Sequence, residues 1–184
     1  MAGSSTISRG MKPIPLRTQL GVVAAGYIAV FLFAVVLVFQ RHMQYVNHPA
    51  DVTASSGMYA AGDLLLELLI AGLFLIPTFL LALAIRKSET AYTRYVQILF
   101  GLSFTAPVCL GVFLIPAVNQ GNSLLGWFCT NRLFVSPIVL MGLTFSRLLA
   151  PFERAKRLIF YALLVEGGTI ALVVILFLSA AHKA

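Results

Sequence analysis

The chain has 184 residues, of which 60% are hydrophobic and only 10% are charged, and its mean hydropathy is +0.95. This composition excludes an ordinary soluble globular domain and predicts an all-α integral membrane protein. The net charge of +7 does not indicate nucleic-acid binding, because the basic residues are dispersed among the ends of apolar stretches. The length leaves no room for a separate soluble domain, so residues 1–184 are expected to form a single membrane domain.

Five apolar stretches are long enough to cross a bilayer. The first apolar stretch follows a basic N-terminal segment, as the apolar part of a signal peptide does. This stretch is too long for a signal peptide and lacks a cleavage site, so it is interpreted as an uncleaved helix. Its small residues Gly21, Ala25 and Ala29 recur every four positions and predict a surface that a neighbouring helix can approach closely. The predicted spans of this five-helix bundle are 20–39, 64–85, 95–115, 126–147 and 158–180.

The distribution of Lys and Arg predicts the orientation of the bundle. The segments before the first span, between the second and third spans and between the fourth and fifth spans are basic, whereas the other joints carry few basic residues. The positive-inside rule therefore predicts a cytoplasmic N-terminus and a C-terminus outside. Asn131 and Arg132 weaken the fourth apolar stretch. An alternative with four spans would return the C-terminus to the inside.

Prolines lie near the middle of three consecutive spans, at Pro77, Pro107 and Pro137. Each removes one backbone hydrogen bond and favours a bend in its helix. Helices bent at a matching depth can enclose a cavity or act as a hinge. They also occur in membrane bundles that have only a structural role.

The charged residues inside the spans are the candidate ligand-binding or proton-binding groups. Asp63 and Glu67 lie on one face of the second span, and Arg132 is expected at a similar height in the fourth, where an ion pair between them is predicted. Such a pair either fixes two helices or lines a site for a zwitterionic or polar ligand. Sequence alone leaves both alternatives open.

Glu166 is the most deeply placed of these residues, well inside the fifth span. The functional interpretation is a protonatable group in a transport path or a contact to a bound molecule. The structural interpretation is a protonated acid that hydrogen-bonds across helices to Ser103, Thr105 or Tyr161. The two interpretations carry about equal weight.

Other residues argue against common kinds of site. His42 and His48 lie in a joint and His182 in the tail, so no span offers a pair of haem ligands, and a metal site with Asp51 is disfavoured. Cys109 and Cys129 are expected to be buried thiols, because a disulfide would require Cys129 to lie unusually deep. Neither a cofactor nor a metal is predicted, and the common catalytic motifs are missing, which disfavours an enzyme.

In length and number of spans the chain resembles the tryptophan-rich sensory protein family, whose members bind porphyrins and sterols. Helices in that family are rich in tryptophan, whereas this chain has one tryptophan. The resemblance is therefore limited to size and span number, and it assigns neither a ligand nor site residues.

Two functional hypotheses follow. The first is a subunit or scaffold of a larger inner-membrane assembly, embedded in the lipid bilayer with other membrane subunits or with copies of itself. The second is a small transporter or ligand-binding membrane protein that uses Glu166, with Glu67 and Arg132, to bind protons or polar ligands. The first is preferred, because five helices leave little room for an enclosed path.

Overall fold

The computed structural model describes residues 15–115 and 124–182. These residues form an all-helical bundle, and five helices or helix pairs are long and apolar enough to cross a membrane, which confirms the predicted helical fold and the number of candidate spans. The helices are α1 (Leu16–Asn47), α2 (Pro49–Ala54), α3 (Ser56–Ile85), α4 (Glu89–Ser103), α5 (Thr105–Phe113), α7 (Leu124–Leu149) and α8 (Glu153–Ala181).

The helices extend several residues beyond the predicted spans, and most of the expected joint between the first two spans is helical. α1 continues to Asn47, and α3 already begins at Ser56. Between them the short helix α2 starts with Pro49, a position where proline costs no helical hydrogen bond. Arg41 and Asp63 therefore both lie on helices, Arg41 on α1 and Asp63 on α3.

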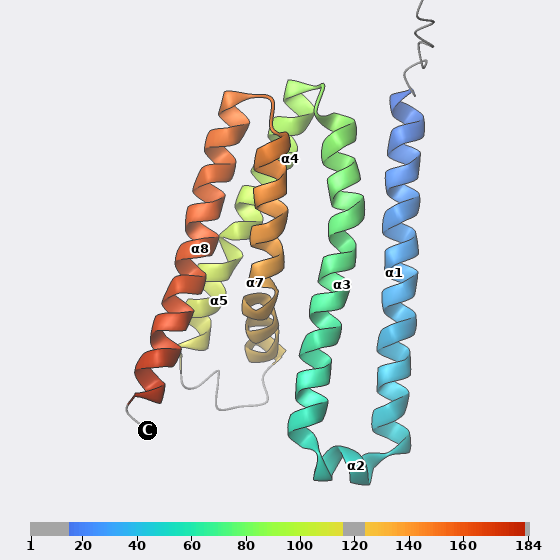
Figure 1. The fold of residues 1–184 in the computed structure, drawn as a ribbon, viewed down its shortest axis with the longest axis vertical. Helices are drawn as coiled ribbons and strands as arrows, with labels where there is room; N and C mark the ends of the chain where they lie inside the picture. Colours follow the sequence, from blue (N-terminus) through green and yellow to red (C-terminus); the bar gives the residue numbers. More distant parts are fainter. Residues whose placement is uncertain (1–14, 116–123, 183–184) are drawn as a thin grey trace, which may run out of the picture.

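The bundle has a compact part and an edge helix (Figure 1). α7 packs against α3 and α8, while α4 and α5 pack against α8, and α5 also packs against α7. α1 lies at the edge of the bundle and packs mainly against α3 (Figure 1). Much of the α1 surface is consequently left uncovered by the rest of the chain.

The third span is divided into two helices at Phe104, where the sequence predicted a bend. Pro107 has no backbone N–H to donate to the carbonyl four residues earlier, on Ser103, so the helical hydrogen-bond series is interrupted there. Pro107 then lies in the first turn of α5, where proline is tolerated. In contrast, α3 and α7 continue through Pro77 and Pro137.

The apolar core lies between α4, α7 and α8, near the turns that join α3 to α4 and α7 to α8. Tyr92 and Ile159 are fully buried in this core, and Leu143 from α7 lies with them. The Tyr92 hydroxyl donates a hydrogen bond of 2.6 Å to the backbone oxygen of Ser146. The side chains of Tyr95 and Ser146 are also hydrogen-bonded, at 3.1 Å, so polar contacts tie α4 to α7 at the rim of the core.

α1 and α3 approach closely at Gly26. A Cβ atom built on Gly26 would lie 3.3 Å from Cβ of Pro77, and the hydroxyls of the residues that follow these two, Tyr27 and Thr78, are hydrogen-bonded at 2.8 Å. The small-residue stripe predicted to receive a neighbouring helix lies away from this contact. Its residues Gly21, Ala25 and Ala29 are exposed. No described helix packs on the stripe, because α1 turns Val23, Gly26 and Ala34 toward α3 and the stripe lies on the opposite side of the helix.

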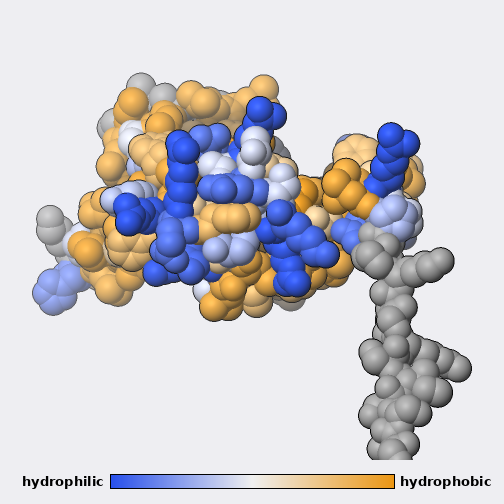
Figure 2. Space-filling model, turned by 90° about the horizontal axis from the view of Figure 1, so that it is seen from above, coloured by the Kyte–Doolittle hydropathy of each residue, from blue (hydrophilic) through white to orange (hydrophobic). Residues whose placement is uncertain are grey.

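The two ends of the bundle differ in charge. The basic end, where α1, α4 and α8 begin, is seen in Figure 2 as a cluster of hydrophilic side chains above the apolar sides. It carries Arg17, Arg86, Lys87, Arg94, Arg147, Arg154, Lys156 and Arg157. The opposite end, at α2, has Arg41 as its basic residue within the described ranges.

The Gly26 contact yields a first prediction. We expect Gly26→Leu to lower the stability of the purified protein by about 1–3 kcal/mol, because the added side chain must displace Pro77 or separate the two helices. Gly21→Leu on the same helix is the matched control, since nothing lies within 4 Å of a Cβ atom built there. Thermal unfolding in detergent provides the comparison, and equal melting temperatures for the two variants would contradict the close approach.

Candidate functional site: a buried ion pair

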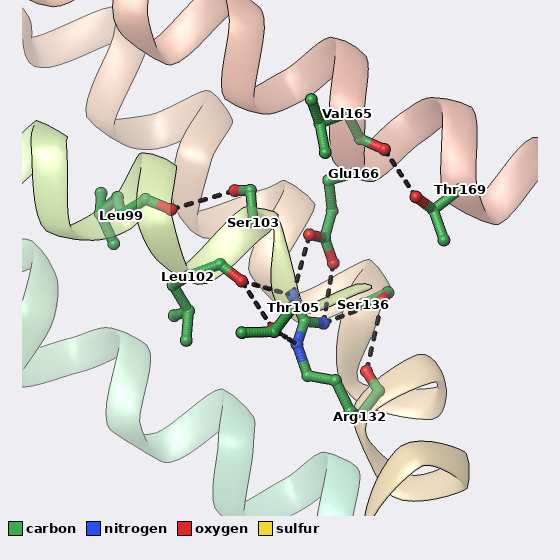
Figure 3. A network of polar contacts seen from close by, with 9 residues as sticks. All are labelled: Leu99, Leu102, Ser103, Thr105, Arg132, Ser136, Val165, Glu166 and Thr169. Carbon is green, nitrogen blue, oxygen red and sulfur yellow. Dashed lines mark hydrogen bonds and ion pairs between the residues drawn. The ribbon is translucent and has the colours of Figure 1, made fainter. Parts of the chain in front are cut away.

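The most buried charged groups form an ion pair between Arg132 of α7 and Glu166 of α8. Nη1 and Nη2 of Arg132 donate to the two carboxylate oxygens of Glu166 at 2.8 and 2.9 Å (Figure 3). The side chains are 9% and 0% exposed, respectively. A bidentate contact of this kind combines charge neutralisation with a fixed geometry. It therefore joins α7 to α8 deep within the bundle.

All five N–H donors of the Arg132 guanidinium have an acceptor. Besides Glu166, the guanidinium reaches the α4–α5 break (Figure 3). Nε donates to Oγ1 of Thr105 at 2.7 Å, Nη2 to the backbone oxygen of Leu102 at 3.4 Å, and Nη1 to Oγ of Ser136 at 3.0 Å. The interrupted third span thus supplies a carbonyl and a hydroxyl to the ion pair. No guanidinium donor is left for a ligand.

The predicted pairing of Arg132 with Asp63 or Glu67 was wrong. α7 lies between α3 and α8, and its Arg132 side chain points toward α5 and α8 rather than toward α3. The predicted partners of Glu166 were also wrong. Ser103 donates to the backbone oxygen of Leu99, and Tyr161 is exposed. Thr105 belongs to the same network, but through Arg132.

Asp63 is instead bound by two residues of α1. Nε of Arg41 donates to Oδ1 of Asp63 at 2.5 Å, and the Tyr45 hydroxyl donates to Oδ2. Nη2 of Arg41 also donates to the backbone oxygen of Tyr59 at 2.7 Å, and the guanidinium lies 4.7 Å from the centre of the Tyr59 ring. These contacts fasten α1 to the first turns of α3. Sequence reasoning missed Arg41, although Arg41 and Tyr45 are one helical turn apart and so share a face.

Glu67 differs from the other candidate residues. Its Oε2 atom is buried and has no hydrogen-bond partner among the described residues. Asp63, one turn earlier on α3, is already engaged by Arg41 and Tyr45. Burying a polar atom without a partner costs free energy, so Glu67 does not contribute to stability in the way that the paired charges do.

Cys109 and Cys129 are buried free thiols, as the sequence predicted. Both line a shallow recess between α5 and α7. Thr105 and Arg132 fix the register of these two helices, and one turn along each helix brings the two thiols together. The thiols therefore extend the α5–α7 contact beyond the ion pair.

Across residues 15–115 and 124–182, no three His, Cys, Asp or Glu side chains are grouped closely enough to hold a metal ion. His48 and Asp51 approach to 3.7 Å, but both are largely exposed. In comparisons with known proteins, no protein-family model, no curated protein and no solved structure matches this chain.

A double-mutant cycle tests the ion pair. We expect Arg132→Met to destabilise the protein by about 3–5 kcal/mol, because it leaves the Glu166 carboxylate buried without its partner. Combining Arg132→Met with Glu166→Leu removes both charges, so the double variant is expected to recover most of that loss. Unfolding in detergent measures each variant. Additive losses would show that the two side chains do not stabilise each other.

Proposed function

We propose that the protein is a non-enzymatic subunit or scaffold of a larger membrane assembly. The observation that carries the proposal is the closure of the Arg132–Glu166 network: its five donors and both carboxylate oxygens are used within the chain. A substrate-binding or proton-carrying site needs polar groups that are free to change partners. The deepest charges of this bundle are instead used to hold helices together.

The uncovered side of α1 supports the same proposal. The small residues Gly21, Ala25 and Ala29 form a stripe on that side, opposite the surface that contacts α3. Small residues allow close packing of helices in membranes, where interfaces are driven by van der Waals contact rather than by the hydrophobic effect. A partner subunit that packs along this stripe would give α1 a second neighbour.

The orientation proposed for this subunit places the basic end in the cytoplasm and the α2 end outside a bacterial inner membrane. The support is the concentration of Lys and Arg at the end seen in Figure 2. In a cysteine-free background, a membrane-impermeant thiol reagent should label Thr53→Cys in intact cells and Glu89→Cys only after lysis. The reverse pattern would invert the orientation.

Intact-complex mass spectrometry after extraction from the native membrane in mild detergent tests the proposed function. We expect a stoichiometric complex with one or more different membrane proteins. Ala25→Leu should release the partner, whereas Ala24→Leu should not, because Ala24 is also exposed but lies off the small-residue stripe. A lone chain with a retained small molecule, in both variants and the wild type, would overturn the subunit proposal.

A second candidate function, binding of a proton or polar ligand, is favoured by the unpaired Oε2 of Glu67. The effect of Glu67→Met separates the candidates. If the protein is a subunit, we expect this variant to keep or raise its melting temperature and to retain its partners, since it removes a buried unpaired group. Loss of a transport or binding activity at unchanged stability would favour the second candidate.

A further inference from the structure

A groove opens between α1 and α3 at the basic end, with a volume of about 480 Å³. Val22 and Val23 of α1 and Leu80 and Leu83 of α3 form its apolar walls, and the polar Thr18 and Gln19 of the first turn of α1 also line it. Its mouth is formed by Arg86 and Lys87, which follow the last turn of α3. The groove thus changes from apolar to cationic along the axis of the helices.

Neither Arg86 nor Lys87 forms an ion pair with a described residue. The ion pairs found in those ranges involve other Lys, Arg and His side chains, and no carboxylate lines the groove. A second depression at the basic end differs in this respect. It is lined by Arg154 and Arg157, but also by Glu153, which forms an ion pair with Lys156 at 2.8 Å. Charge therefore favours an anion at the α1–α3 groove.

We propose that this groove binds one anionic phospholipid of the surrounding bilayer. The phosphate lies between Arg86 and Lys87, and an acyl chain extends along Val22 and Leu83 toward the bilayer centre. Basic residues where a span meets the cytoplasmic surface attract anionic headgroups, and an apolar groove below them holds the chain at the depth that a bilayer lipid requires. Neither feature alone specifies this ligand, since a free phosphate would leave the apolar walls unused.

The position of the groove determines which helices the lipid would contact. The groove lies between α1 and α3 on the basic side of the Gly26–Pro77 contact, and Arg86 and Lys87 follow the end of α3. A lipid in the groove would contact both helices and fill the space between them. The inference is independent of the proposed subunit role, because it requires only that the chain spans a bilayer.

Native mass spectrometry of the detergent-purified full chain, titrated with phosphatidylglycerol or phosphatidylcholine, tests the proposal. We expect one tightly retained phosphatidylglycerol, bound more strongly than phosphatidylcholine. Arg86→Gln with Lys87→Gln should weaken its apparent affinity roughly thirty-fold, the loss expected for two cationic contacts. Arg154→Gln with Arg157→Gln removes the same charge from the same end and should change the affinity by less than about two-fold.

A third variant tests the apolar part of the groove. Ala84→Phe fills the groove without changing any charge, and it should also weaken phosphatidylglycerol binding. Equal weakening by the two double variants would overturn the proposal in favour of a general surface potential, as would equal binding of the two lipids or normal binding by Ala84→Phe. If the Arg86 and Lys87 double variant does not fold, Lys87→Gln alone decides, with an expected loss of roughly five-fold.

Discussion

The cost of burying a charge among apolar helices governs this fold. Arg132 lies in the interior of a span, where it is tolerated because Glu166 neutralises it and because a hydroxyl or carbonyl accepts each remaining N–H. Meeting that requirement draws together α7, α8 and the junction of α4 with α5. The break at Phe104 is part of the solution, since it leaves Thr105 and the Leu102 carbonyl facing the guanidinium.

The edge of the bundle is organised by a different kind of contact. Arg41 and Asp63 are 22% and 39% exposed, near the end of the helices, where water can reach them. Such a pair contributes less to stability than a fully buried one, so the close packing of Gly26 on Pro77 carries much of the α1–α3 contact. Gly142 allows similarly close packing between α7 and α3, because a Cβ atom on Gly142 would lie 2.9 Å from Cδ2 of Leu75.

The spans and the break near Pro107 could be predicted because hydropathy and the missing proline N–H act locally along the chain. The partners of the charges could not, because they depend on the rotation of each helix about its own axis. Arg132 was correctly identified as an interior charge, yet only the order α3–α7–α8 decides that it faces Glu166 rather than Glu67. Arg41 was missed because α1 extends further than its apolar stretch.

The separation of Arg132 and Glu166 along the chain has a consequence for biosynthesis. Glu166 is 34 residues C-terminal to Arg132, so all of α7 is synthesised before the carboxylate that neutralises its guanidinium. α7 also has the lowest hydropathy of the five candidate spans, and its arginine adds to the cost of insertion, by up to the roughly 2.5–3.5 kcal/mol found at the centre of a span. α7 on its own is therefore a poor substrate for the insertion machinery. In a membrane, entry of α7 and α8 together, as a helical hairpin with the ion pair already closed, would remove that barrier.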